Sequence, residues 1–405
     1  MNVKIQKGTP CGKITAPASK SMAHRILISA AMADGVSTVH GLSDCEDVEA
    51  TISCLEALGV RIERDGDNAR IWGVDMRSVT PTSALNCHES GSTLRFFIPI
   101  ALLSGKNTLF LGAESLMKRP MNVYEQLCRE KGLIYNADGK SIAVKGLLTP
   151  GEYEIVGNIS SQFISGLIFA LPLLDQDSKI KIITPIESKS YIDLTIEALS
   201  FFGVEVKWMD EATLYIKGGQ KYTPTEVTVE GDYSGAAFID ALSLFGANVS
   251  VEGLNPNSTQ GDKIYKLLFG MLKKGVATIH ISNCPDLGPV LFAVAAAKHG
   301  GVFTGTKRLK IKESDRSAAM AAELAKFGVS VTEYDDRIVV YPVSFHAPTT
   351  TLCGHNDHRI VMALSVLLTL TGGEIEGAEA IAKSYPSFFE DLSKLGIEVN
   401  AYDAG

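Results

Sequence analysis

The sequence predicts a protein of the α/β class, built from α+β repeats that fill two domains. Three observations predict it: six helix ends that are followed by glycine and a β-like tail, six apolar helices with polar openings, and one irregularity shared by both series. The glycines are Gly59, Gly132, Gly203, Gly275, Gly328 and Gly396. A glycine in the left-handed position just past a helix, followed by alternating β-branched residues, marks a helix-to-strand junction.

The apolar helices form the second series. Their polar openings are marked by Ser21, Gly91, Ser161, Ser234, Leu287 and His358. These markers are 70, 70, 73, 53 and 71 residues apart, and the glycines are 73, 71, 72, 53 and 68 residues apart. Both series shorten at the same place, which chance matching would not produce. Each unit therefore holds a buried helix, a strand region, and a second helix that ends in glycine and another strand.

The domain organisation follows from the repeats. The marked helices are apolar nearly all round, so we expect them in the centre of a domain with sheets outside them. A chain of 405 residues is too long for one ordinary core. The six units divide naturally into three and three, and the turn-rich stretch 217–232 is the expected break.

Composition excludes several classes of protein. The net charge is −8, from 38 basic and 46 acidic residues, which disfavours nucleic acid as a partner because that binding depends on phosphate neutralisation. The first residues lack the apolar core of a signal peptide, and no apolar run reaches membrane-spanning length. Seven scattered cysteines without a CxxC pair indicate a reducing compartment rather than a disulfide framework or a zinc site. We expect a cytoplasmic protein that binds no membrane.

The polar openings of the helices indicate where anions bind. A helix N-terminus presents unpaired N–H groups and a positive dipole end. In PASKSMAHR (17–25), Lys20 shares a helix face with His24, and Ser21 with Arg25. Cations at that end of a helix are unfavourable unless an anion binds there too. The openings SGS (90–92) and SSQ (160–162) could hold phosphate in the same way, although each alone also fits an ordinary helix cap.

Charged clusters elsewhere have two readings each. MKRP (117–120) fits an anion loop or a solvated loop, and KESDR (312–316), if helical, fits an anion site or a surface ion-pair ladder. In HNDHR (355–359) two histidines lie three apart, but no further histidine or cysteine pairing completes a zinc site, so anion capture is favoured and no metal is expected. Asp286 in CPDLG fits a proton-transfer residue or a simple cap.

Taken together, the cations lie near corresponding ends of the repeated units. They are Lys20, Arg25, Arg119, Lys312, Arg316 and Arg359. Asp286, Glu313 and His358 stand among them as candidates for proton transfer beside bound anions. This constellation predicts an enzyme whose substrates carry phosphate and carboxylate groups.

The same motifs, in order along nearly the whole chain, closely resemble those of the 5-enolpyruvylshikimate-3-phosphate synthases, a family of enolpyruvyl transferases. The matching motifs are PASKSMAHR, SGSTLR, MKRP, SSQF, SKSYID, VEGDYS, KESDR and NDHR. The resemblance implies a two-domain inside-out α/β barrel with three βαβαββ units and buried helices in each domain. It places 19–229 in one domain and 1–18 with 230–405 in the other, and it puts the active site in the cleft between them. It also implies a monomer without metal or organic cofactor.

The implied reaction joins shikimate 3-phosphate to phosphoenolpyruvate and releases phosphate through a tetrahedral intermediate. By the same resemblance, shikimate 3-phosphate is held by Lys20, Ser21, Arg25, Ser160, Ser161, Gln162, Ser188, Tyr191, Asp286 and Lys312. Phosphoenolpyruvate is held by Lys20, Gly91, Arg119, Gln162, Arg316 and Arg359. Asp286 deprotonates the 5-hydroxyl, Glu313 protonates the methylene carbon with Lys20 as the alternative acid, and His358 supports the site by hydrogen bonding.

The sequence departs from the family pattern in two places. Glu89 stands where an asparagine is common, and a carboxylate about 4 Å from an anionic ligand repels it by roughly 1 to 4 kcal/mol, depending on the dielectric. The C-terminal lysine that often contacts phosphoenolpyruvate has no clear counterpart, since Lys383 is displaced in the sequence.

Two alternatives remain open. UDP-N-acetylglucosamine enolpyruvyl transferases share the fold, but typically carry a cysteine in the loop before their arginine-proline pair, and the corresponding stretch 112–120 has none. A catalytically silent protein that kept the anion cleft is the other, although it would not need Asp286, Glu313 and Lys20.

Overall fold

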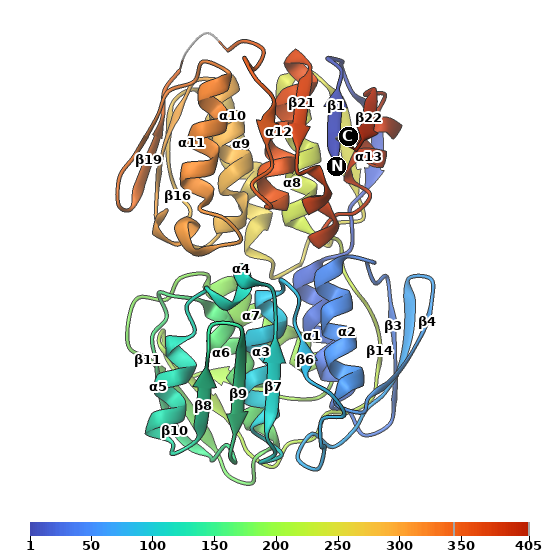
Figure 1. The fold of residues 1–405 in the computed structure, drawn as a ribbon, viewed down its shortest axis with the longest axis vertical. Helices are drawn as coiled ribbons and strands as arrows, with labels where there is room; N and C mark the ends of the chain where they lie inside the picture. The colour runs from blue at the N-terminus through green and yellow to red at the C-terminus, as the bar shows by residue number, and fades with distance from the viewer. Residues whose placement is uncertain (343–344, 404–405) are drawn as a thin grey trace. The chain divides into compact units, whose positions relative to one another are not determined.

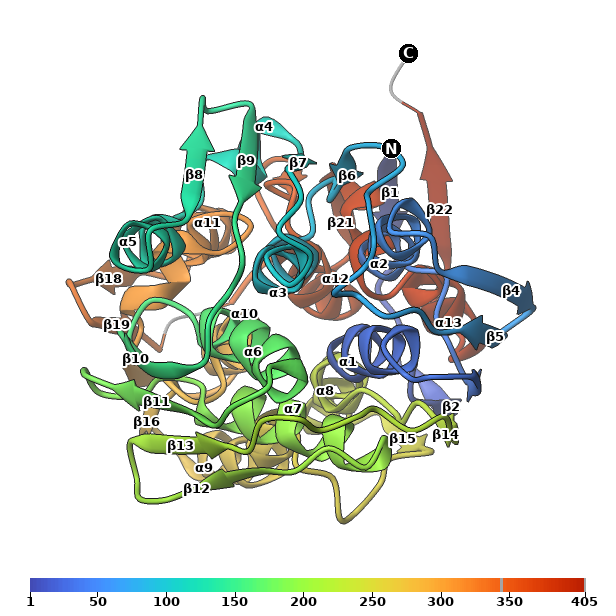
Figure 2. The ribbon, with the colours of Figure 1, turned by 90° about the horizontal axis from the view of Figure 1, so that it is seen from below.

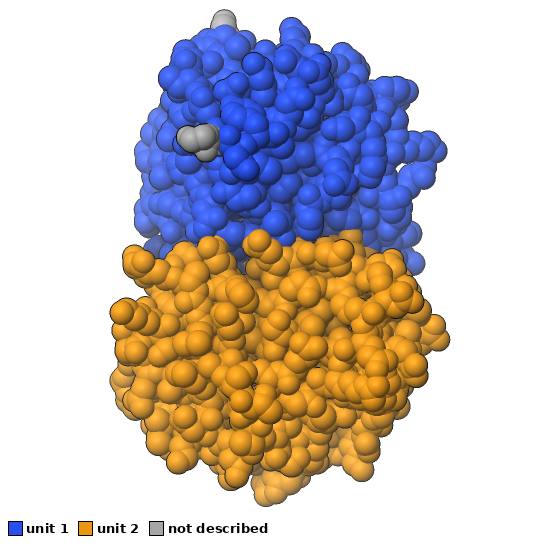
Figure 3. Space-filling view, turned by 45° about the vertical axis from the view of Figure 1, so that its right-hand side comes forward, with its two compact units in different colours: residues 1–17, 231–405 blue, residues 18–230 orange. Residues whose placement is uncertain are grey.

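The fold consists of two compact units. A computed structural model of the chain describes residues 1–342 and 345–403. The N-terminal unit comprises residues 18–230, and the C-terminal unit comprises residues 1–17 and 231–405 (Figure 3). Both units alternate helices with strands (Figure 1), which confirms the predicted α/β class. Among the described residues, no helix has the length and apolar character needed to cross a membrane.

The N-terminal unit contains the first three repeats. Its helices are α1 (Lys20–Ala31), α2 (Glu46–Ala57), α3 (Gly91–Ala101), α4 (Glu114–Met117), α5 (Asn122–Glu130), α6 (Ser161–Ala170), η1 (Leu171–Leu173) and α7 (Lys189–Phe201). Its strands are β3 (Val36–His40), β4 (Arg61–Asp65), β5 (Asn68–Trp72), β6 (Leu85–Asn86), β7 (Thr108–Leu111), β8 (Ile134–Ala137), β9 (Ser141–Lys145), β10 (Gly151–Ile155), β11 (Ser178–Ile182), β12 (Val206–Trp208), β13 (Thr213–Ile216) and β14 (Glu226–Thr228).

The strands of this unit repeat one topology. Residues 18–230, all of them described, form three four-stranded sheets in the orders β14-β3-β5-β4, β6-β7-β9-β8 and β10-β11-β13-β12. In each sheet the first pair is parallel and the other two pairs are antiparallel. The parallel pair is joined through a buried helix in the second and third sheets. In the first sheet, β14 from the end of the unit supplies the missing strand beside β3.

The marked helices form the core of this unit, as predicted. In Figure 2, α1, α3 and α6 lie inside, and the strands β6–β9 and β10–β13 lie outside them. α3 packs on α6, where a Cβ at Gly166 would collide with the hydroxyl of Tyr124 and the carbonyl of Arg95. The Tyr124 hydroxyl lies within hydrogen-bond distance of the carbonyls of Arg95 in α3 (2.8 Å) and Phe163 in α6 (2.9 Å), so it links these two helices.

The C-terminal unit contains the other repeats and the first strands of the chain. Its helices are α8 (Tyr233–Ala241), η2 (Leu242–Phe245), η3 (Gly261–Ile264), α9 (Tyr265–Lys274), η4 (Pro285–Leu287), α10 (Gly288–Ala297), η5 (Lys307–Ile311), α11 (Arg316–Lys326), α12 (His358–Thr371), η6 (Ala378–Lys383) and α13 (Phe388–Lys394). Its strands are β1 (Asn2–Ile5), β2 (Cys11–Thr15), β15 (Asn248–Glu252), β16 (Ala277–His280), β17 (Gly301–Thr304), β18 (Val331–Glu333), β19 (Arg337–Val340), β20 (Leu352–Cys353), β21 (Gly373–Glu376) and β22 (Val399–Tyr402).

The sheets of this unit follow the same pattern with one exception. Within its described residues, β16-β17-β19-β18 and β20-β21-β1-β22 repeat the four-stranded topology, and β15 pairs only with β2. β1 lies antiparallel between β21 and β22, so the first strand of the chain completes a sheet whose other strands are β20, β21 and β22. The buried helices α8, α10 and α12 pack on one another.

The glycines that revealed the repeats lie where the sequence predicts, with one difference. Five of them follow a helix with φ between 66° and 90°, the left-handed conformation that glycine adopts readily: Gly59, Gly132, Gly203, Gly328 and Gly396. Gly275 instead has φ of 157°, which is close to extended, and it follows α9 directly. The prediction of a left-handed cap is therefore wrong at Gly275, which begins the shortest interval of the series.

Candidate active site

The polar openings of the N-terminal unit are capped helix starts. Ser19 accepts from the N–H of Met22 (3.3 Å), Ser90 from the N–H of Thr93 (3.2 Å), and Ser160 from the N–H of Gln162 (3.3 Å). These serines are the N-caps of α1, α3 and α6. The next residues of each helix carry N–H groups at its positive end, where an anion is favoured.

Arg25 joins two of the helices that carry predicted shikimate 3-phosphate residues. Its Nε donates to Thr195 Oγ1 (2.8 Å), one terminal nitrogen donates to the carbonyl of Ser21 (2.6 Å), and the other donates to the carbonyl of Tyr191 (3.0 Å). The side chain is only 2% exposed, and burial lowers its pKa to about 10. Arg25 is therefore a fixed, desolvated cation that links the start of α1 to the start of α7, where Ser188 is the N-cap.

Lys20 has a partner that the sequence analysis missed. Its Nζ lies 2.7 Å from Oδ2 of Asp47, in the first turn of α2. Both side chains are largely shielded from solvent, so the ion pair fixes the position of the ammonium group. The neighbouring His24 is not the cation that its spacing suggested, because it is buried against Thr51 and its pKa is lowered well below the usual value by burial and by Lys20 and Arg25.

Gly91 lies at the meeting point of the predicted phosphoenolpyruvate residues of this unit. A Cβ at Gly91 would come within 2.8 Å of a terminal nitrogen of Arg119 and within 3.8 Å of Oε1 of Gln162. Gln162 is held in turn by Arg95, which donates to its Oε1 (2.8 Å), and it donates through Nε2 to Ser92 (2.8 Å). Glycine here leaves room for Arg119 beside the start of α3. Glu89, the departure noted in the sequence, is half-buried next to the N-cap Ser90.

In the C-terminal unit, three predicted cations surround Asp286. Its Oδ1 lies 2.7 Å from Arg316 and 3.2 Å from Lys312, and its Oδ2 lies 3.9 Å from Arg359. Asp286 lies in η4 before α10, while Arg316 and Arg359 lie at the starts of α11 and α12. Two repeats, the fifth with α10 and α11 and the sixth with α12, therefore bring charged residues at their helix starts to one cluster, as the common phase of the repeats predicts.

The cluster shifts the titration of its own members. Burial alone would raise the pKa of Asp286, but Lys312, Arg316 and Arg359 outweigh it and hold that pKa well below its usual range. Burial lowers the pKa of Lys312, and the nearby Asp286 only partly offsets this. Asp286 is therefore ionised at neutral pH, and its pKa depends on the contacts with these three cations.

Arg316 is bound by two further acids. Its terminal nitrogen lies 2.7 Å from Oε2 of Glu313, and its Nε lies 2.9 Å from Oδ2 of Asp357. Asp357 is fully buried and caps α12 by accepting from the N–H of Arg359 (2.9 Å). The guanidinium is 1% exposed, so the surface ion-pair ladder considered for KESDR is excluded. The helical placement of Lys312 is also wrong, because Lys312 is extended and α11 begins only at Arg316.

His358 and Lys383 both lie beside the start of α12. His358 is the first residue of that helix and is buried. Lys383 is buried at the end of η6, and its Nζ donates to the carbonyl (2.7 Å) and the side chain (2.8 Å) of Asn356. Lys383, although displaced in the sequence from the family's lysine, therefore contacts the HNDHR segment directly.

Left-handed backbone outside glycine is concentrated at these helix starts. Among the described residues, positive φ angles at non-glycine positions occur at His88, Ser188, His355 and Asn356. Each lies at, or within two residues of, the N-cap of α3, α7 or α12. Such conformations are unfavourable and persist where the surroundings enforce them, which is typical of functional sites.

Two further acidic residues near these helix starts were not predicted from the sequence. Asp47 contacts Lys20, and Asp262 hydrogen bonds to Ser234 at the start of α8. Burial, and then the charge of Asp286, raise the pKa of Asp262 to about 7. Asp47 follows the marker Ser21 by 26 residues and Asp262 follows the marker Ser234 by 28. The phase of the repeats was the signal that could have found both.

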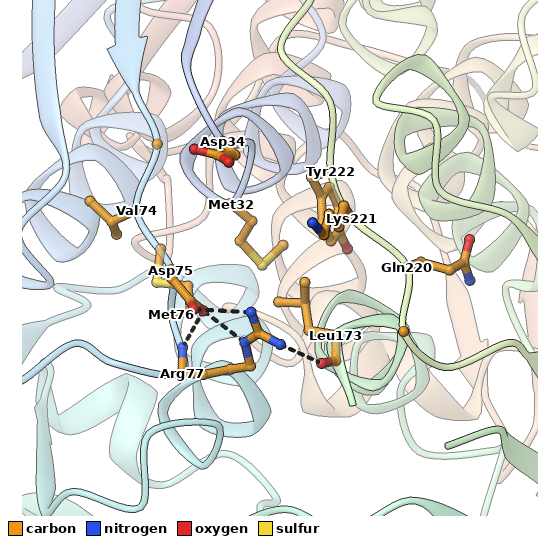
Figure 4. A pocket seen from close by; sticks show the side chains of 12 residues that line it. Met32, Asp34, Val74, Asp75, Met76, Arg77, Leu173, Gln220, Lys221 and Tyr222 are labelled. Atoms are coloured by element: carbon orange, nitrogen blue, oxygen red, sulfur yellow. Dashed lines mark hydrogen bonds and ion pairs between the residues drawn. The ribbon is translucent and has the colours of Figure 1, made fainter. Parts of the chain in front are cut away.

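The N-terminal unit also has a pocket that contains none of the predicted residues. It measures about 240 Å³ and lies where α1 and η1 end, with Met32, Met76, Leu173 and Tyr222 in its lining (Figure 4). Arg77 stands at its edge and is held by Asp75 (2.8 Å). The predicted residues Ser21, Ser160 and Ser161 lie at the opposite, N-terminal ends of α1 and α6, and none of the predicted site residues lines this pocket.

Comparisons with known proteins agree with these motifs. A family model described as EPSP synthase (3-phosphoshikimate 1-carboxyvinyltransferase) matches residues 6–392. The 3-phosphoshikimate 1-carboxyvinyltransferase of Clostridium novyi (strain NT) is 37% identical over 433 residues, covering 100% of this chain and 99% of that protein. The one from Clostridium beijerinckii is 38% identical over 432 residues with the same coverage. A solved EPSP synthase from Acinetobacter baumannii is 26% identical with a TM-score of 0.79, covering 99% of this chain and 100% of that one.

Proposed function

The chain belongs to the EPSP synthase family, the 3-phosphoshikimate 1-carboxyvinyltransferases, and we propose that the residues described above divide between the two substrates of that reaction. As a member of the family it is an enzyme that transfers an enolpyruvyl group in aromatic biosynthesis. The observation that carries the assignment of residues is the gathering of Lys312, Arg316 and Arg359 around one carboxylate, Asp286.

Shikimate 3-phosphate is assigned mainly to the N-terminal unit. Its phosphate is held by the hydroxyls and N–H groups at the starts of α1, α6 and α7, with Arg25 as the fixed cation. The residues are Lys20, Ser21, Arg25, Ser160, Ser161, Gln162, Ser188 and Tyr191, completed by Asp286 and Lys312 from the other unit. Helix N-termini with serine caps support this assignment because they favour phosphate.

Phosphoenolpyruvate is assigned to a set of residues that includes three arginines. The paired N–H donors of a guanidinium group match the oxygens of phosphate and carboxylate. The residues are Lys20, Gly91, Arg119, Gln162, Arg316 and Arg359. We add Lys383, which is buried beside Asn356. We further propose that the two sets act on one pair of bound substrates in a cleft between the domains 19–229 and 1–18 with 230–405.

Proton transfer is assigned to the acids around Arg316. Protonation of the methylene carbon of phosphoenolpyruvate by Glu313, or by Lys20, leaves cationic character on the adjacent carbon. The 5-hydroxyl oxygen of shikimate 3-phosphate attacks that carbon, and its proton passes to Asp286. Loss of a proton from the new methyl group and cleavage of the bond to phosphate then give the enol ether and free phosphate.

Arg316 connects binding to this chemistry. Its guanidinium is held by Asp286, Glu313 and Asp357. An anionic substrate that takes up the guanidinium weakens its hold on Glu313 and Asp286, which favours a proton on the first and basicity in the second. His358, at the start of α12, supports the bound anion by hydrogen bonding.

The test is phosphate release from the purified protein with both substrates present and with each omitted in turn. Release that requires both supports the proposal. Release from phosphoenolpyruvate alone, or none with both, would contradict it. Replacing shikimate 3-phosphate by UDP-N-acetylglucosamine tests the rival acceptor, and turnover with that acceptor alone would favour the rival.

We also propose a cytoplasmic monomer. The seven cysteines are all free, which supports a reducing compartment. Light scattering of the purified protein gives the mass in solution, and a value twice the 43.4 kDa of the chain would contradict the monomer.

A further inference from the structure

One face of α11 holds the segment that leads into α12. Arg316 and Glu323 are seven residues apart, so they lie on the same side of that helix. Arg316 binds Asp357 (2.9 Å), and Glu323 accepts through Oε2 from the N–H of Cys353 (2.9 Å). Oε1 of Glu323 lies 3.0 Å from Nε2 of His355. Residues 353–357 are therefore fastened to α11 at both ends.

This segment has an unfavourable backbone. His355 and Asn356 have φ angles of 50° and 51°, two successive left-handed residues without a glycine. The His355 ring is held by Glu323, and Asn356 is held by Lys383 through its carbonyl and its side chain. Such a conformation persists only where side chains over-determine it. These two clamps supply that constraint.

The location of the clamp gives it a consequence for binding. Asp357 follows directly as the N-cap, and His358 and Arg359 are the first residues of α12. A shift of the segment would therefore move two of the groups assigned to phosphoenolpyruvate and its reaction. Glu323 itself is 2% exposed, and its polar contacts to residues 353–357 are to Cys353 and His355 rather than to His358 or Arg359.

We propose that Glu323 is a positioning residue for the enolpyruvyl transfer, which acts through Cys353 and His355 to fix the backbone that presents His358 and Arg359. The inference rests on the proposed function, because that function assigns Arg359 to phosphoenolpyruvate and His358 to the support of the bound anion. Loss of the Glu323 side chain should weaken phosphoenolpyruvate binding and spare shikimate 3-phosphate binding, which is assigned mainly to the other unit.

The variants are Glu323→Ala, Glu323→Gln and Lys326→Ala. Glu323→Ala removes both contacts, and Glu323→Gln keeps a carbonyl oxygen for the Cys353 N–H and an amide that can bond the His355 ring. Lys326→Ala is the matched control, since Lys326 lies 2.9 Å from Glu323 and its Nζ donates to the carbonyl of Thr351 (2.9 Å), outside residues 353–357. We expect KM for phosphoenolpyruvate to rise about tenfold in Glu323→Ala and to stay within about twofold of wild type in the other two.

A purely structural role would behave differently. It would lower thermal stability and active fraction without a selective change in KM, and Glu323→Gln would not rescue it. The dissociation constant of shikimate 3-phosphate should therefore stay within about twofold in Glu323→Ala, while the double variant with His355→Ala should be no worse than Glu323→Ala alone. An unchanged KM for phosphoenolpyruvate, or fully additive effects of the two substitutions, would overturn the proposal.

A second measurement is independent of turnover. Amide hydrogen exchange in a peptide covering 353–359 should increase in Glu323→Ala and not in Lys326→Ala, and unchanged exchange would overturn the clamp. The wild-type assay separates the two hypotheses. No phosphate release by wild type contradicts the proposed function, whereas normal wild-type turnover with an unaffected Glu323→Ala contradicts only the positioning role.

Discussion

A 2.7 Å ion pair joins Arg316 to Asp286, and both side chains belong to the set assigned to substrates. The same guanidinium also binds Glu313 and Asp357. The protein's own carboxylates thus contact the cations that we assign to an anionic substrate. This arrangement keeps the cations oriented and their charge compensated.

Arg316→Ala should abolish turnover and also destabilise the fold. Arg316 is only 1% exposed and lies among three acids, Asp286, Glu313 and Asp357. Removing one partner of such a buried pair costs about 3 to 5 kcal/mol of unfolding free energy. Arg316→Lys retains the charge without the planar fork, so it should keep more stability than Arg316→Ala and still lose most turnover. Urea denaturation and phosphate release measure the two effects; a stable, inactive Arg316→Ala would contradict this account.

The sequence predicted the repeats because they are local and periodic. Each helix cap, apolar run and polar opening depends on a short run of consecutive residues. The glycines and markers therefore located the helix ends of both units. Gly275 differed, and it begins the short interval of 53 residues, where the pattern itself is interrupted. The fold class was therefore predictable, down to which helices are buried.

The side-chain partners were less predictable. Lys20 with Asp47 and Asp286 with Arg316 are pairs whose members are 27 and 30 residues apart, joined only by folding. The spacing within KESDR suggested a helix, whereas the backbone of Lys312 is extended. Lys312 and Arg316 of this motif both pair with Asp286, which lies outside the motif. Motif spacing can show that charges gather, but it cannot show which acid holds which cation.

Gly91→Ala should raise KM for phosphoenolpyruvate about tenfold and leave shikimate 3-phosphate binding nearly unchanged. The added Cβ would lie 2.8 Å from Arg119 and 3.3 Å from Arg95, the residue that holds Gln162. Steady-state kinetics with each substrate varied separately measures the effect. Gly270→Ala in α9 is the control, because a Cβ there meets nothing within 4 Å. Equal changes in both KM values would contradict the assignment of Gly91.

Asp47→Asn should lower kcat/KM by roughly threefold to tenfold, because Lys20 loses the carboxylate that fixes its ammonium group. The control is Glu46→Gln, which removes the same charge from the same first turn of α2 at an exposed position. Both substitutions weaken the favourable interaction with the helix dipole to a similar degree. Equal losses of kcat/KM in the two variants would show that the helix, rather than Lys20, accounts for the effect.

Asp262→Asn should change how stability depends on pH. Burial and the charge of Asp286 raise the pKa of Asp262 to about 7, whereas an unfolded aspartate titrates near 3.9. Between these values the folded protein holds a proton that the unfolded chain has released, so the contribution of this group falls as pH rises, by about 1.4 kcal/mol per pH unit. Asparagine has no such titration and can still hydrogen bond to Ser234.

The stability of Asp262→Asn relative to wild type should therefore increase by roughly 2.5 kcal/mol from pH 5 to pH 8. Urea denaturation at both pH values gives the two differences in unfolding free energy. Asp335→Asn serves as the control, since that side chain is 80% exposed and should give the same small difference at both pH values. A difference that does not change with pH for Asp262→Asn would show that the folded protein keeps this buried acid ionised throughout the range.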